Sequence, residues 1–127
     1  MNPAARRYAQ AERQTASPER LMVLLFQAAL RNVRAGAEAL ERGTAAEAAR
    51  PLTLASDIVV ELHATLDRPR APELCDQLAA VYRFVCDRLG AAALARDARA
   101  AREAERALAP IAEAFEAAAA RLAAGGR

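Results

Sequence analysis

Four stretches of this chain repeat apolar residues every three or four positions, and short breaks separate one stretch from the next. This spacing is the period of a helix that has one apolar face. It predicts helices over residues 18–42, 44–67, 72–93 and 97–122. Because the connections are short, neighbouring helices should run antiparallel. We therefore predict an all-α fold, an up-down antiparallel four-helix bundle with a short N-terminal leader that is helical or extended.

Residue types at the breaks favour helix ends. The run Ser17-Pro18-Glu19 is a helix start, since the serine can cap, the proline fits the first turn and the carboxylate complements the helix dipole. Thr44 and Glu47 predict a capping box for the second helix, and Asp97 predicts a cap on the fourth. Pro51 either kinks the second helix or begins its regular part.

The composition fits one helical domain. The chain has 127 residues, of which 37 are alanine, and aromatic residues make up only 4%. Alanine favours helix, and a chain this long has room for a single core. We expect one domain over residues 1–127, with a leader or lid at 1–16, the bundle at 17–123 and a frayed tail at 124–127.

Charge and hydropathy narrow the expected partners and location. The net charge is +2, with the 18 arginines scattered among 16 acidic residues, so no basic face for nucleic acid is expected. No apolar stretch approaches the roughly 18 residues that a membrane span needs. Without a visible signal peptide, the chain is expected to be soluble and cytoplasmic, and no membrane insertion is expected.

The cysteines and the histidine do not form a recognisable site. Two cysteines and one histidine are too few for a four-ligand zinc site. Cys75 and Cys86 would lie about 16 Å apart along one helix, which is too far for a disulfide. We expect both to be small buried apolar residues in a reducing compartment. No metal-binding residue and no cofactor are expected.

Some apolar residues do not fit a single core. The run of six apolar residues at 21–26 covers every side of its helix, so something besides one neighbouring core must contact it. Phe84 falls on the polar face of the third helix and Val60 on the polar side of the second. The predicted core stripe of the third helix is Leu74, Leu78, Val81, Val85 and Leu89. The predicted core stripe of the second helix is Leu52, Ala55, Val59, Leu62 and Leu66.

Two explanations of this surplus remain open. Phe84 can be an ordinary surface aromatic partly covered by its neighbours, and the run at 21–26 can be covered by the leader, in which Tyr8 is suited to closing an apolar groove. Alternatively, the residues line an exposed groove that receives a helix of a partner. Both hold if the leader is a movable lid.

The sequence resembles a known family in four places that occur in order. Tyr8-Ala9-Gln10 and Thr15-Ala16-Ser17-Pro18-Glu19-Arg20-Leu21, followed by Leu24-Leu25-Phe26, resemble the opening of the FliS flagellin export chaperones. The match continues through the segments Ala55-Ser56-Asp57-Ile58-Val59-Val60-Glu61-Leu62 and Leu66-Asp67, and then Val81-Tyr82-Arg83-Phe84 and Arg88-Leu89. Each segment is weak alone, but together they span nearly the whole chain.

The chain departs from the family pattern at several positions. Gln27-Ala28 replaces the usual Asp-Gly, and Asp87 stands where the first arginine of an Arg-Arg pair is expected. The customary Asn after the third helix is alanine, and the tryptophan late in the last helix is absent, with Phe115 as the candidate replacement. These departures bear on client affinity and identity rather than on the fold.

The resemblance implies a function. It implies a non-enzymatic cytoplasmic chaperone that holds the C-terminal segment of unassembled flagellin, prevents premature polymerisation and delivers the client to the flagellar export gate. The chain would act as a monomer or weak dimer. A disordered amphipathic client would fold on the apolar surface of the bundle. The expected flagellin-binding and lid residues are Tyr8 as the lid, Val23, Leu24 and Phe26 on the first helix, Ile58 and Val60 on the second, and Phe84 on the third.

Other functions were weighed on the residues alone. Phosphotransfer on His63 would need a nearby group to steady the phosphoryl, whereas Asp67 places a repelling carboxylate four positions on. A di-iron bundle needs paired Glu-x-x-His motifs, and hydrolysis needs a base partnered with a nucleophile; neither is visible. No catalytic residue is expected. The remaining alternative is a generic helical adaptor with a different amphipathic client.

Overall fold

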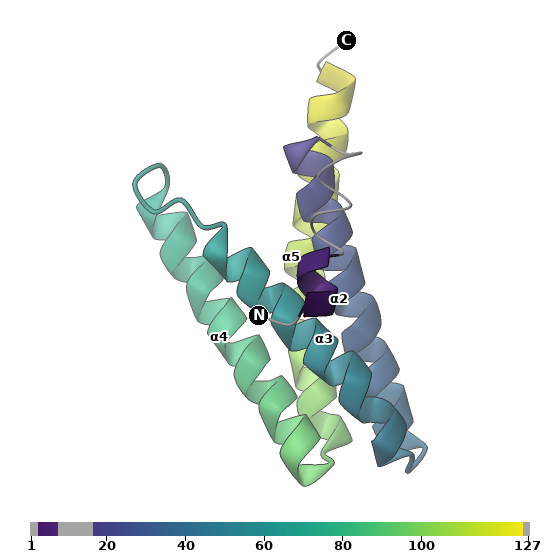
Figure 1. Ribbon diagram of the computed structural model, residues 1–127. Helices are drawn as coiled ribbons and strands as arrows, with labels where there is room; N and C mark the ends of the chain where they lie inside the picture. The colour runs from purple at the N-terminus through teal and green to yellow at the C-terminus, as the bar shows by residue number, and fades with distance from the viewer. Residues whose placement is uncertain (1–2, 8–16, 126–127) are drawn as a thin grey trace.

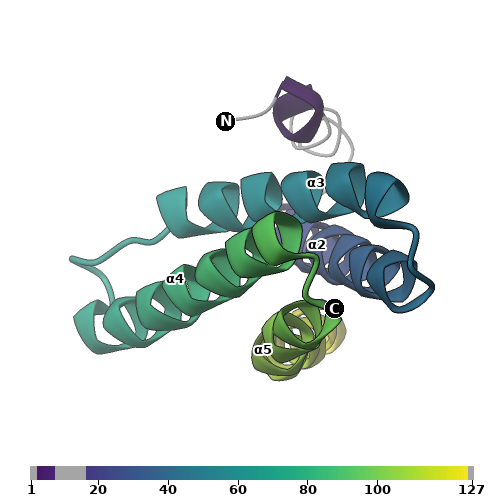
Figure 2. The ribbon, with the colours of Figure 1, turned by 90° about the horizontal axis from the view of Figure 1, so that it is seen from below.

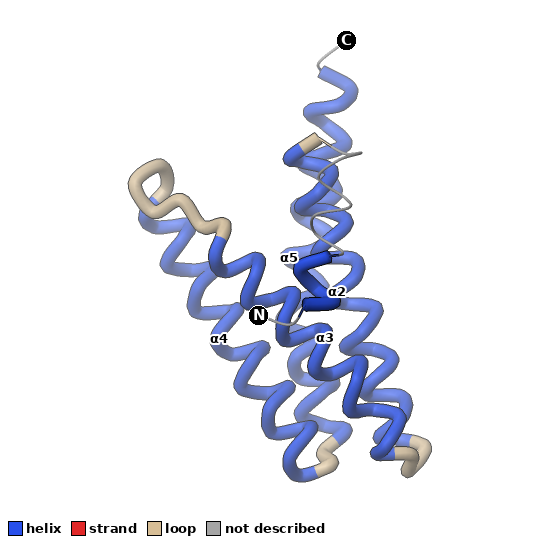
Figure 3. Tube along the Cα trace, viewed as in Figure 1, coloured by secondary structure: helices blue, strands red, loops and turns tan. Residues whose placement is uncertain are grey.

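The computed structural model describes residues 3–7 and 17–125, and every regular element within these ranges is a helix (Figures 1 and 3). A short helix covers residues 3–7. Four long helices follow: α2 at Pro18–Glu41, α3 at Ala45–Ala64, α4 at Pro72–Ala95 and α5 at Ala98–Gly125. The predicted all-α class is confirmed. The second helix ends three residues earlier than expected, and the other helices end within about three residues of their expected ends.

The four long helices form a closed ring of neighbours. Helix α2 packs against α3 and α5, and α4 packs against the same two helices from the other side. Each connection is short and reverses the chain direction, which gives the predicted up-down antiparallel bundle (Figure 2). The pair α2–α5 and the pair α3–α4 meet at the turns around Gly43 and Arg96 and diverge toward the opposite end (Figure 1). We call this second end of the bundle the open end.

Helix starts follow the predicted caps at two of three positions. The hydroxyl of Ser17 accepts a hydrogen bond from the backbone N–H of Arg20 at 3.2 Å. The carboxylate of Asp97 accepts from the N–H groups of Arg99 and Ala100 at 3.0 and 3.3 Å. Both interactions satisfy N–H groups that have no partner within the helix. The sequence signals for the starts of α2 and α5 are therefore confirmed.

The prediction of a capping box at the start of α3 is wrong. The side chain of Thr44 makes no cap on α3. Its hydroxyl donates instead to the backbone carbonyl of Ala39 at 2.9 Å, and its N–H donates to the same oxygen at 2.8 Å. Thr44 thus satisfies a carbonyl at the end of α2, and Gly43 makes the turn with a φ of 78°. Helix α3 also continues through Pro51, so its regular part begins before this proline.

The core contains the predicted stripes with two differences. Buried positions of α3 and α4 include most of the expected residues, but Leu74 is 51% exposed because it lies in the first turn of α4, near the open end. Tyr82, which the sequence left outside the core stripe, is fully buried. Cys75 is buried and Cys86 partly buried, and both are free thiols. Burial raises the pKa of the Cys86 thiol.

The short helix at 3–7 lies on the outer side of α3 (Figure 2). Ala5 is buried there as part of the core cluster. Ala4 faces a shallow recess whose other lining residues, Ala49, Arg50, Thr53 and Leu54, all belong to α3. Part of the expected leader therefore packs against the bundle.

Candidate functional site: the apolar surface of the bundle

Two of the expected contact residues lie on the surface. Val60 of α3 is 51% exposed and Phe84 of α4 is 45% exposed. Phe84 follows the buried Tyr82 by two positions, and two positions turn a helix by about 200°, so the two rings point in opposite directions. The prediction that Val60 and Phe84 lie on polar faces is confirmed.

Three of the expected groove residues belong to the core, which corrects that expectation. Val23, Phe26 and Ile58 are each at most 1% exposed. Within the run at 21–26, Val23, Leu25 and Phe26 are buried because α2 packs on two sides, against α3 and α5, whereas the other three residues are half-buried. Phe26 and Ile58 therefore cannot contact a partner unless the bundle opens. Leu24 is half-buried, and Tyr8 lies outside the described residues.

An aromatic row crosses the bundle beneath the open end. The ring of Phe26 in α2 stacks on Phe115 of α5 at 4.9 Å and lies 6.3 Å from Tyr82 of α4, centroid to centroid. Tyr82 meets His63 of α3 edge-on at 6.3 Å. The row thus takes one ring from each long helix. Aromatic contacts of this kind add to the stabilisation that area burial provides.

Tyr82 carries a polar group into this row. Its hydroxyl is buried and has no hydrogen-bond partner among residues 3–7 and 17–125. Burial, with a smaller contribution from Cys75, raises the pKa of Tyr82 to about 12, so the phenol is neutral at physiological pH. Sequence periodicity placed the core stripe one position away, at Val81. The signal that could have found Tyr82 is its seven-residue spacing from Cys75 and Leu89, both of which are buried.

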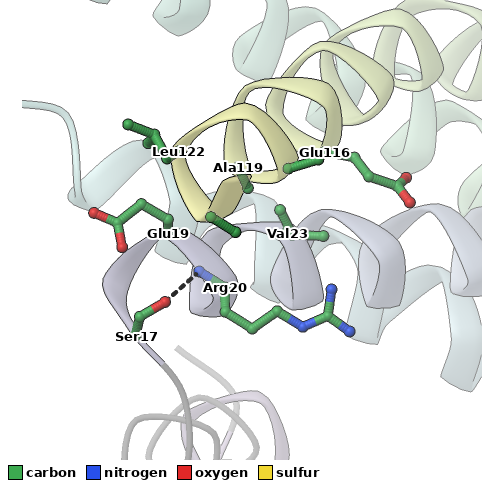
Figure 4. A pocket seen from close by; sticks show the side chains of 9 residues that line it. Ser17, Glu19, Arg20, Val23, Glu116, Ala119 and Leu122 are labelled. Atoms are coloured by element: carbon green, nitrogen blue, oxygen red, sulfur yellow. Dashed lines mark hydrogen bonds between the residues drawn. The ribbon is translucent and has the colours of Figure 1, made fainter. Parts of the chain in front are cut away.

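Two recesses flank the contact between the first turns of α2 and the last turns of α5. The outer one is lined by Val23 and Ala119, with Arg20 on the α2 side and Glu116 on the α5 side (Figure 4). The inner one is almost wholly apolar and is lined chiefly by Met22, Phe115, Ala118 and Leu122. Met22 also reaches the hydroxyl of Thr65 at the end of α3, with 4.0 Å between oxygen and sulfur.

These features give a four-helix bundle that leaves several large apolar side chains exposed, among them Val60, Phe84 and Leu122. Comparison with models of known protein families matches residues 1–122 to the family described as flagellar protein FliS. The chain belongs to the FliS family. This membership implies the role of a flagellar export chaperone without enzymatic activity. Among individually curated proteins, no sequence matches this one.

No group of three or more His, Cys, Asp or Glu side chains within the described ranges could hold a metal ion. The described helices also include none that is long and apolar enough to cross a membrane. His63 is exposed on α3, where its ring packs against Tyr82.

An ion-pair network joins α2 to α5 in the half of the bundle away from the open end. Arg102 donates to both carboxylate oxygens of Glu41, at 3.0 and 2.7 Å, and to Glu105 at 3.0 Å. Arg34 donates to the other oxygen of Glu105 at 2.7 Å. The hydrogen bond from Arg102 lowers the pKa of Glu41. For Glu105, partial burial raises the pKa, but the bonds from Arg34 and Arg102 outweigh it and lower the pKa overall.

Proposed function

We propose that this FliS-family chain is a cytoplasmic chaperone that binds the C-terminal segment of unassembled flagellin, keeps it from polymerising and delivers it to the export gate. The observation that carries this proposal is the family match over residues 1–122. Exposed apolar side chains on a stable bundle support it, since a chaperone of this kind needs a surface complementary to an amphipathic client.

The proposed contact surface includes the apolar residues that a client can reach. It comprises Val60 and Phe84, which are exposed, and the half-buried Leu24. Phe26 and Ile58 act instead as core residues that hold these positions in place. Burying about 1,000 Å² of apolar area would contribute roughly 25 kcal/mol before costs. The free energy needed to order a disordered client and to immobilise it on the chaperone offsets most of this contribution, so the net affinity is moderate.

The leader is the proposed lid of this surface. The helix at 3–7 already packs on α3, with Ala5 buried. We assign residues 1–16 to the lid, with Tyr8 as the side chain that closes over apolar surface in the absence of the client. A client helix would then displace the leader, and the affinity of the free chaperone for the client would include the cost of that displacement.

The test is titration calorimetry with a peptide of about 40 residues from the C-terminus of flagellin of the same organism, about 60 Å long when helical. The proposal predicts saturable binding at one peptide per chain, and tighter binding to a variant that lacks residues 1–16. Absence of heat and of co-elution would show that the client is not flagellin and would favour the alternative of a generic helical adaptor.

A further inference from the structure

Two recesses follow one another along the contact between α2 and α5, and we call them together the groove. The outer recess at the open end and a second recess further along the same two helices share Glu116 in their linings. Four small or apolar residues contribute to the floor: Val23, Leu30, Ala112 and Ala119. From Arg20 to Glu38 the groove is about 27 Å long at the helical rise, which is the length of five turns of a bound helix.

The two rims of this groove carry opposite charges. The α2 rim contributes Arg20 and Arg31, and the α5 rim contributes Glu113 and Glu116. Figure 4 shows Arg20 and Glu116 on opposite sides of Val23 and Ala119, while Glu19 is directed away from Val23. The α2 side also includes two carboxylates, Glu19 at the open end and Glu38 at the far end of the groove.

These rim charges are not used within the bundle. All four residues are exposed, and among the described residues no ion pair or hydrogen bond involves the side chain of Arg20, Arg31, Glu113 or Glu116. Arg34 also lines the groove, but its side chain is paired within the bundle: Nε of Arg34 lies 2.7 Å from Oε2 of Glu105. The charged side chains that form ion pairs between α2 and α5 are therefore different residues from those that border the groove.

We infer that this groove binds an amphipathic helix whose apolar stripe has acidic residues along one edge and basic residues along the other. The apolar stripe would lie on the alanine-rich floor, where small side chains allow a close approach of the helix axes. The acidic edge would face Arg20 and Arg31, and the basic edge would face Glu113 and Glu116. Turning such a helix end for end exchanges its two edges, so the rims select one direction of the bound chain.

Shape favours a helix over a second copy of this chain. A second copy would present the same concave groove, and two grooves facing one another leave the floors unfilled. A single helix fills one groove. The inference goes beyond the proposed function because it specifies the charge pattern and direction of a bound helix, whether that helix belongs to flagellin or to another protein.

Synthetic helical peptides of about 18 residues, matched to the groove length, test the inference. One carries Glu on one edge of an Ala/Leu stripe and Lys on the other, and a second of the same composition mixes both charges on each edge. Fluorescence anisotropy should show the zoned peptide binding about tenfold more tightly than the mixed one, the effect of a few exposed ion pairs. This preference should decline as salt is added.

Direction is tested with a photo-crosslinker at the N-terminus of the zoned peptide. It should attach at one end of the groove, and exchanging the two edges of the peptide should move it to the other end. The double variant Arg31→Glu with Glu113→Arg should weaken or reverse this preference, while thermal unfolding confirms that it folds. Equal affinity of the two peptides, no binding to the wild-type chain, crosslinks outside α2 and α5, or a dimer that these substitutions dissociate would each overturn the inference.

Discussion

Phe26 of α2 and Phe115 of α5 stack with their ring centroids 4.9 Å apart and their planes at 30°. Phe26 is fully buried, whereas Phe115 is half-buried and lines the apolar recess at the open end. The stack therefore closes the core where the two pairs of helices begin to diverge. It links the stability of the bundle to a side chain that also borders the open end.

Removing the Phe115 ring should destabilise the bundle by about 2 kcal/mol, less than the roughly 3–5 kcal/mol for a fully buried phenylalanine, because Phe115 is only half-buried. The measurement is urea unfolding of Phe115→Ala followed by circular dichroism. Phe115→Leu should recover more than half of this loss. A change in Phe115→Ala too small to measure would show that the stack does not support the core.

Gly36 of α2 lies directly against the side chain of Leu52 in α3. A Cβ at this position would lie 2.4 Å from Cδ2 and 2.7 Å from Cγ of the buried Leu52. Gly36→Ala should therefore lower the free energy of unfolding by about 1–2 kcal/mol, even though alanine is favoured over glycine within a helix by about 1 kcal/mol.

Gly90 is the matched control for this substitution. It lies inside α4, and a Cβ there would meet nothing within 4 Å. Gly90→Ala should stabilise the chain by up to about 1 kcal/mol. Chemical denaturation of both variants tests the pair. Equal effects at the two positions would contradict the close contact between α2 and Leu52.

Phe84→Glu should separate binding from stability. Because Phe84 is 45% exposed, its replacement should change the melting temperature by no more than about 2 °C. Loss of an apolar contact at the proposed surface should weaken binding of the flagellin peptide about tenfold or more. The control is Leu94→Glu, near the end of α4, which should alter neither property. A large loss of stability in Phe84→Glu would place the ring in the core instead.

The network around Arg102 should make stability sensitive to acid. Glu41 and Glu105 have pKa values below the ordinary 4.5 in the folded chain. The folded state therefore binds protons less readily than the unfolded state, and the contribution of these groups is present above pH 4.5 and lost as the pH falls through their folded values. Melting temperatures between pH 7 and pH 3 measure this loss.

Arg102→Gln should flatten that acid dependence, since it removes the main partner of Glu41 and one partner of Glu105. Arg99→Gln is the control, because Arg99 is exposed on the same helix and its side chain makes no ion pair or hydrogen bond among the described residues. Identical pH profiles for wild type and Arg102→Gln would show that the network does not stabilise the fold.

The fold could be predicted from the sequence because helical period, Ser17, Asp97 and the short breaks all favour the same bundle. The Thr44 cap could not, since the hydroxyl found a nearer acceptor in the Ala39 carbonyl, which depends on the geometry of the turn. The surface positions of Val60 and Phe84 followed from the period of each helix.

Burial of the run at 21–26 was harder to foresee. Its apolar residues point to all sides of α2, and their burial depends on how closely α3 and α5 approach, which a single helix does not encode. Phe26 and Ile58 were therefore placed in a groove although both are core. The charged groove along α2 and α5 could not be predicted either, because its rims come from residues roughly 80 to 95 positions apart in the chain.

The central claim is that this chain masks the segment through which flagellin assembles. Light scattering of purified flagellin, seeded to polymerise in the presence of increasing amounts of this protein, tests it most directly. The account predicts that polymerisation stops near one chaperone chain per flagellin and resumes when the C-terminal peptide of flagellin is added as a competitor. Polymerisation at an unchanged rate with the chain in excess would contradict it.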